Sequence, residues 1–263
     1  LQTYFAKHAW GNTTLEDLLV ELEASSGRKL DGWVNTWLQT AGVNTLRPSL
    51  EIEGDVYKSI TIKQEAPLVP ADSKELRPHR LAVGLYDISG DSLKLRKSVE
   101  LDVAGEATVV AELAGEKVAD LLLINDRDLS YAKLRFDDRS IATLKTHLGK
   151  LDDALARALC WASIWDMHRD AEISSADFIE IALNGLAGET DDAIVNIVLM
   201  QLNTSVEAYA KDSNRAAYRE KLANGLWALT NSSAPGSDIQ LLASRAFAIN
   251  AHTADQTAKI REL

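Results

Sequence analysis

Hydrophobic and polar positions divide the chain into three stretches, and the first has the spacing of helices. Thr13 with Glu16 three residues later predicts a capping box, and Gly27 predicts a left-handed stop. A second helix is expected to begin near Asp31. Apolar side chains recur every three or four positions on one face of each predicted helix: Leu15, Leu18, Leu19 and Leu22, then Leu30, Val34 and Leu38.

The second stretch alternates apolar and polar residues, which is typical of strands with one buried face. The alternating positions include Ile60 and Ile62, then Leu81, Val83 and Leu85, then Val99, Leu101 and Val103. The run Leu121 to Ile124 is apolar throughout, which predicts a strand buried on both faces. Residues 65–80 hold three prolines and are expected to form a long loop. Short strands joined by turns at this spacing indicate a small β-sandwich.

The third stretch, after Asp137, has helical spacing throughout. Breaks are expected at Gly149, Asp170, Gly188, Lys211 and residues 231–236, and N-caps at Asp152, Ser174 and Asp191. Successive helices of similar length with short turns are typical of an α-solenoid of paired helices. The helix from about Asp238 carries Ile239, Leu242, Phe247 and Ile249, so it is expected to leave apolar surface uncovered at this end.

The predicted fold class is therefore α+β and multidomain. The expected domains are residues 1–47, which are helical, residues 48–136, which form the β-sandwich, and residues 137–263, which form an all-α, solenoid-like domain of paired helices.

Composition excludes some classes of partner. The 263 residues carry a formal net charge of −11, which argues against nucleic acid and anionic membrane as partners. The apolar runs are too short to cross a bilayer. The chain has one cysteine, Cys160, so no intrachain disulfide forms and a reducing compartment is expected. We therefore expect a cytoplasmic location.

No catalytic or metal-binding motif stands out. The five histidines are His8, His79, His147, His168 and His252. No two of them lie within one helical turn, and the zinc motif H-E-x-x-H is absent. Cys160 is interpreted as a small buried apolar residue rather than a nucleophile. We therefore predict no catalytic residue and no metal ligand in this chain, and its substrate-binding residues stay unknown.

Three polar or aromatic groups each have two interpretations. The segment Trp165 to Asp170 is either an acid/base site or, in the favoured interpretation, a solvated and salt-bridged helix end. The acids Asp126, Asp128, Asp137 and Asp138 lack the alternation and glycine of a calcium loop, which favours capping and turn roles. Trp161 and Trp165, one helical turn apart, are expected in the core.

The opening stretch carries a set of motifs in a recognisable order. They are Tyr4-Phe5, His8-Ala9-Trp10-Gly11-Asn12-Thr13, Asp17-Leu18, Ser26-Gly27, Trp33 with Trp37, and Gly42-Val43. In this order they resemble the end of the catalytic domain in the aminopeptidase N family of zinc metallopeptidases, the gluzincin aminopeptidases. Trp10 stands where tyrosine is commoner in that family.

Later segments extend the resemblance over essentially the whole chain. Gln64-Glu65 and His79-Arg80-Leu81 resemble parts of the family's β-sandwich. Residues 121–133 resemble the strands that lead into its helical C-terminal domain. Leu159-Cys160-Trp161 resembles the actinobacterial branch.

The resemblance implies what each stretch is. Residues 1–47 would be the last helices of the catalytic domain, residues 48–136 the β-sandwich domain, and residues 137–263 an incomplete helical C-terminal domain. Intact members remove N-terminal residues from peptides, using a zinc-bound water and a general-base glutamate. Their zinc motif would lie before Leu1. This chain is therefore expected to be a fragment that is inactive and holds no zinc on its own.

Two hypotheses about function follow. In the first, the chain is the non-catalytic C-terminal portion of a monomeric zinc aminopeptidase, and its sandwich and helical domain brace and cap the active site. Its partners would be the upstream catalytic domain and, through the intact parent, peptide substrates. In the second, the chain is a stand-alone module whose sandwich and solenoid bind a protein or peptide. An upstream reading frame containing H-E-x-x-H distinguishes the two.

Overall fold

The computed structural model describes residues 1–262 and has two compact units. The first unit consists of Leu1–Asn44 together with Ala66–Arg77, and the second holds the rest of the described chain. Each unit has its own hydrogen bonds and packing.

The first unit contains the predicted helical pair. Its helices are α1 (Gln2–His8), α2 (Leu15–Ser26) and α3 (Asp31–Leu38). The capping box of α2 lies one position later than predicted, because Thr14 and Asp17 form it. The Thr14 backbone N–H donates to Asp17 Oδ2 at 2.8 Å, whereas the Thr13 hydroxyl bonds Tyr4. Gly27 ends α2 with a φ of 67°, as predicted.

A buried arginine holds the proline-rich loop Ala66–Arg77 against α3. Arg77 is 3% exposed, and its guanidinium donates to Thr36 O at 3.0 Å, Thr40 Oγ1 at 2.6 Å and Asn44 Oδ1 at 3.1 Å. These acceptors are neutral and lie at or just beyond the C-terminal end of α3, where carbonyl groups favour a cation. The loop and the helix therefore form one unit.

We expect Arg77→Met to loosen this unit. The apolar side chain removes the charge-assisted hydrogen bonds to Thr36, Thr40 and Asn44, each of which contributes on the order of 1.5–3 kcal/mol. Hydrogen exchange should become faster in residues 66–77 and in the last turn of α3. Lys74→Met, in the exposed part of the same loop, is the matched control. Unchanged exchange in Arg77→Met would contradict the role given to the guanidinium.

The second unit begins with two sheets, which confirm the predicted β-sandwich. The first sheet has the order β5 (Ala107–Val109), β2 (Val56–Glu65), β1 (Thr45–Glu53) and β7 (Lys133–Leu134). The second has the order β4 (Ser92–Val103), β3 (His79–Ser89) and β6 (Leu121–Ile124). All pairs are antiparallel except β1 with β7. A short 3-10 turn, η1 (Ala111–Leu113), follows β5.

The strand β6 has core on both of its faces, as its apolar run predicts. Leu122 and Ile124 belong to the core between the two sheets, where Ile60 and Ile62 also lie. Leu121 and Leu123 belong instead to the core of the helices that follow. Because successive side chains of a strand alternate in direction, one short strand serves two cores. The second unit is therefore layered as sheet, sheet and helices.

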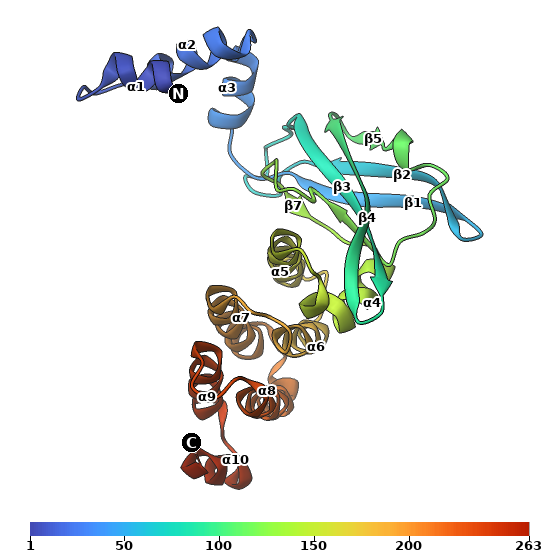
Figure 1. The fold of residues 1–263 in the computed structure, drawn as a ribbon, viewed down its shortest axis with the longest axis vertical. Coiled ribbons are helices and arrows are strands. Elements are labelled where there is room, and N and C mark those ends of the chain that lie inside the picture. The colour runs from blue at the N-terminus through green and yellow to red at the C-terminus, as the bar shows by residue number, and fades with distance from the viewer. Residues whose placement is uncertain (263) are drawn as a thin grey trace. The chain divides into compact units, whose positions relative to one another are not determined.

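Helices make up the rest of the second unit. They are α4 (Asp138–His147), α5 (Ala154–Arg169), α6 (Ser175–Leu186), α7 (Asp192–Thr204), α8 (Asp212–Ser232), α9 (Asp238–Asn250) and α10 (Ala254–Lys259). Short helical turns lie at η2 (Leu148–Lys150) and η4 (Ile260–Glu262), and η3 (Ser205–Tyr209) is a π-helix. Figure 1 shows α4 and α5 beside the sandwich and the helices from α6 onward following one another away from it.

Most of the predicted caps and breaks in this region are confirmed. Ser174 and Asp191 are the N-caps of α6 and α7, but Asp153 rather than Asp152 caps α5. The breaks at Gly149 and Gly188 bring two stretches of backbone together. A Cβ on Gly149 would lie 2.3 Å from Gly185 O, and one on Gly188 would lie 2.3 Å from Gly149 O. Side chains there would force the turns apart.

The end of the helical layer is better covered than the sequence suggests. Phe247 is fully buried and packs on Trp227, with ring centroids 4.9 Å apart. Ile239 and Leu242 pack against the same core, which leaves Ile249 as the exposed member of the predicted apolar set. The expected bare apolar face is therefore wrong for most of α9.

The sequence-based division at residues 47/48 and 136/137 stays a prediction. Strands occupy the chain between Thr45 and Leu134, and α4 begins at Asp138. However, sheet residues such as Tyr86 and Leu93 share a core with the helices. No helix in residues 1–262 is both long and apolar enough to serve as a membrane span.

Candidate functional site

The histidines do not form a zinc site. His79 is buried, with Nδ1 2.6 Å from Ser130 Oγ and Nε2 2.9 Å from Gln64 Oε1. His168 is buried elsewhere, among aromatic rings. Within residues 1–262, no three histidine, cysteine or acidic side chains come together as metal ligands. The donors among the described residues therefore do not fit the zinc that the family resemblance implies.

Cys160 is part of the core of the helices. It is fully buried in the middle of α5, and burial raises the pKa of its thiol well above its usual value. A thiol held neutral is a poor nucleophile. The interpretation as a small apolar residue agrees with this setting.

Asp170 is partly exposed and salt-bridged, as the favoured interpretation of the Trp165 to Asp170 segment predicts, but the expected solvation is wrong for His168, which is buried. The His168 ring stacks on Phe178 with centroids 4.8 Å apart, and Tyr209 packs edge-on at 5.3 Å. Its Nδ1 donates to the Ile173 carbonyl at 3.0 Å, which leaves the lone pair on Nε2. Burial lowers the pKa of His168, so the ring is held neutral.

Asp170 and Glu172 form a charged clasp with strands of the sandwich. Lys133 donates to Asp170 Oδ2 at 2.7 Å, and Arg135, whose side chain is 2% exposed, pairs with both acids. Arg47 of β1 reaches Glu172 at 2.8 Å. Burial opposes ionisation of both carboxyl groups, but these cations outweigh it and lower their pKa values. No sequence pattern predicted this clasp, because its partners lie far apart along the chain.

The acids considered for calcium have other roles. Asp126 is buried and accepts hydrogen bonds from Tyr86 and from Ser98, the latter at 3.1 Å. Burial raises the pKa of Asp126 and of Tyr86. Asp137 caps α4 through the backbone N–H groups of Arg139 and Ser140. The predicted capping role is thus confirmed for Asp137.

Trp161 lies in the core, as predicted, and its indole N–H takes part in a buried network of hydrogen bonds. The Glu189 side chain is 0% exposed and accepts from Arg157 Nε at 3.0 Å and from Trp161 Nε1 at 2.8 Å. The backbone N–H groups of Thr190 and Asp191 donate to the same carboxylate at 2.9 and 3.1 Å. This network joins the start of α5 to the turn between α6 and α7, so its role is structural.

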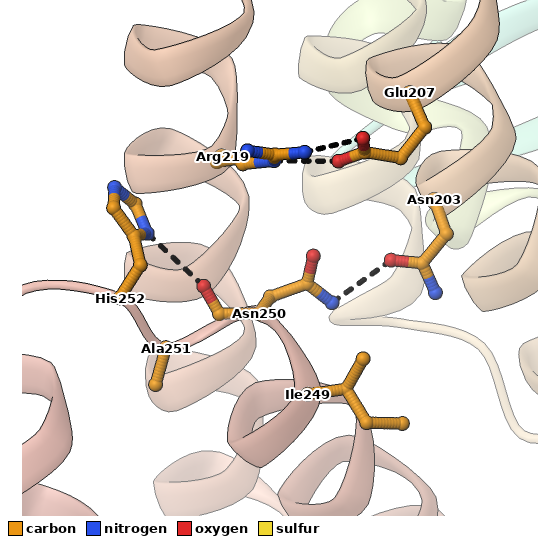
Figure 2. A pocket seen from close by; sticks show the side chains of 7 residues that line it. All are labelled: Asn203, Glu207, Arg219, Ile249, Asn250, Ala251 and His252. Atoms are coloured by element: carbon orange, nitrogen blue, oxygen red, sulfur yellow. Dashed lines mark hydrogen bonds and ion pairs between the residues drawn. The ribbon is translucent and has the colours of Figure 1, made fainter.

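The helical layer also carries an open hollow, shown in Figure 2, that the sequence did not predict. Its volume is about 480 Å³, and its lining comes from the end of α7, from η3, from α8 and from the end of α9. The lining residues are Asn203, Glu207, Arg219, Ile249, Asn250, Ala251 and His252. It is one of several hollows in the described residues that could receive a ligand, and its lining contains no arrangement of nucleophile and base.

The sheets and helices form a small sandwich joined to a helical layer, and comparison with known proteins agrees with this class of architecture. Residues 121–263 match the family model of the ERAP1-like C-terminal domain. The chain is 45% identical over 261 residues to the aminopeptidase N of Streptomyces lividans. That alignment covers 97% of this chain and 30% of the relative, so the chain spans about a third of the relative's length. The chain belongs to the aminopeptidase N family.

Proposed function

We propose that this chain is the non-catalytic C-terminal portion of a zinc-dependent aminopeptidase that hydrolyses N-terminal residues from peptides. The observation that carries the proposal is the 45% identity along 97% of the chain to an aminopeptidase N. The described residues offer no donor set for zinc. The zinc, its ligands and the catalytic glutamate would come from the rest of the protein.

The proposed role of this portion is to brace and cap the active site. A rigid support suits that role, and the second sheet and the helices share one core, which the Arg135 clasp reinforces. Residues 1–47 would belong to the catalytic domain, residues 48–136 would form the bracing sandwich, and residues 137–263 would form the capping domain.

The proposal extends to partners and location. The net charge of −11 disfavours nucleic acid, and a free buried thiol suits the cytoplasm. The partners would be the upstream catalytic domain and peptide substrates, in a monomeric parent.

Activity and zinc content test the proposal. The isolated chain should not hydrolyse aminoacyl amides and should hold no stoichiometric zinc. The protein encoded by the complete reading frame should hold about one zinc ion and lose activity on chelation. Tightly bound zinc with chelator-sensitive hydrolysis in the isolated chain would overturn the proposed division of labour. A complete reading frame that encodes no zinc motif would favour the stand-alone interaction module instead.

A further inference from the structure

The strand β1 has one edge that is largely open. Its inner edge pairs with β2 along its whole length, whereas its outer edge pairs with β7 only at Thr45 and Leu46. The last hydrogen bond on the outer edge runs from the Arg135 backbone N–H to Leu46 O at 2.9 Å. Among residues 1–262, no other strand pairs with the rest of this edge. It is a place where a sheet can accept another strand.

The pairing with β2 shows which backbone groups point outward. In an antiparallel pair, successive residues point their N–H and C=O groups alternately toward the partner and away from it. Leu46 points outward, because its carbonyl bonds to a residue outside the pair. Pro48, two residues later, therefore points outward as well. A proline is tolerated there because the outer edge needs no N–H from it.

Leu50 and Ile52 point the same way. Their partners across the pair are Ile60 and Tyr57, and both of these bond at 2.8 Å to backbone groups beyond the far edge of β2. In such a pair neither residue bonds to the other, so both members point away. The open edge therefore presents the carbonyl of Pro48 and both backbone groups of Leu50 and of Ile52.

The side chains along this edge form an apolar row and an acidic row. Leu50 is partly buried and Ile52 is 50% exposed, on one face of the strand. Glu51 and Glu53 are exposed on the other face. Lys58 lies 3.6 Å from Glu51, but both side chains are 65% exposed, and an ion pair this exposed contributes little. The acidic row is therefore available to another cation.

We propose that the open edge of β1 docks an extended, basic segment of a partner protein, which joins the first sheet as a further strand. The partner's main chain bonds to Leu50 and Ile52, and its lysine or arginine side chains face Glu51 and Glu53. Its apolar side chains cover Ile52. A second copy of this chain fits poorly, because pairing β1 with β1 brings two acidic rows together. The proposal does not depend on the proposed function.

Amide exchange tests the predicted docking in the wild-type chain. The probe is the capped peptide Ac-Lys-Val-Lys-Val-Lys-Val-NH2, and exchange is measured for each residue by NMR. At saturating peptide we expect the Leu50 and Ile52 amides to exchange at least about tenfold more slowly, with a Kd on the order of 1 mM or below. The Ser49 amide, which faces β2, should keep its rate. Equal slowing at all three amides, or at none, would overturn the proposal.

A second peptide and two variants exclude a general attraction between a basic peptide and an acidic protein. Ac-Lys-Lys-Lys-Val-Val-Val-NH2 has the same charge without the alternation and should bind about tenfold more weakly. Ile52→Pro removes an outward N–H and should weaken binding of the alternating peptide about tenfold, whereas Ile52→Ala keeps the N–H and should weaken it less. If the two peptides or the two variants bind equally well, the proposed strand addition is wrong.

The charge row and the complete protein are tested by titrating the labelled alternating peptide and following its fluorescence anisotropy. Glu51→Gln should weaken binding about fivefold, whereas Glu220→Gln, at an exposed acid of α8, should leave the Kd unchanged. Equal effects of these two changes would refute selection by the acidic row. The protein encoded by the complete reading frame should bind the peptide as this chain does. Failure to bind there would mean that another part of that protein, or a second copy, covers the edge, and the proposal would fall.

Discussion

Glu189→Gln should cost the helical layer about 3–5 kcal/mol of unfolding free energy, because it leaves the buried guanidinium of Arg157 without its counter-charge. Arg157 also donates to Leu151 O at 2.8 Å, so it cannot swing out to solvent without breaking a second contact. For a domain of this size the loss corresponds to a fall in Tm on the order of 10 °C. Thermal unfolding followed by circular dichroism measures it.

Two further variants separate the ion pair from packing. Glu180→Gln neutralises a partly exposed acid of α6 and should change the Tm little, because exposed pairs contribute about 0–1 kcal/mol. Replacing both Arg157 and Glu189 by Met should restore part of the loss, since no unpaired charge remains. A single Glu189→Gln variant as stable as Glu180→Gln would show that the buried pair is not a major contributor.

Stability should also fall as the pH drops from about 6.5 to 5, because His168 is held neutral in the folded chain. Its pKa is lowered by burial, so the unfolded chain takes up a proton at a higher pH than the folded chain does. The stability this histidine supplies is therefore complete above its unfolded pKa and is lost below it, at up to about 1.4 kcal/mol per pH unit. Urea unfolding at a series of pH values measures this slope.

The difference between the wild type and His168→Phe isolates this contribution. The variant cannot take up the proton, and effects of carboxyl groups such as Asp126, whose pKa burial raises, cancel in the difference. Trp165→Phe alters the same aromatic cluster but retains the imidazole, so it should keep the wild-type slope. If His168→Phe shows the same slope as the wild type, a different group causes the acid sensitivity.

Local sequence signals predicted the elements well and the contacts between them poorly. Alternation and helical spacing located the sandwich and the helices, because burial of one face imposes those periods. The predicted cap positions were less accurate. Thr13 and Asp152 each lie one position before the observed N-cap, since neighbouring polar residues compete for the same role.

Contacts between distant residues had no signal in the pattern. The buried Arg77 looks like any loop arginine until the loop folds onto α3. The two carboxamides of the hollow are separated by 47 positions. His168 was noticed in the sequence, but only its neighbours Phe178 and Tyr209 reveal that it is buried and neutral.

The strand β6 bears on how this protein can be divided for experiments. A chain cut between residues 136 and 137 would separate the helices from Leu121 and Leu123, which fill their core, and would expose that surface to water. The helical fragment from such a cut is expected to aggregate. A fragment that starts before Leu121 keeps both leucines with the helices. In calorimetry, the sandwich and the helices should accordingly melt in a single transition, since neither core is complete without the same four-residue strand.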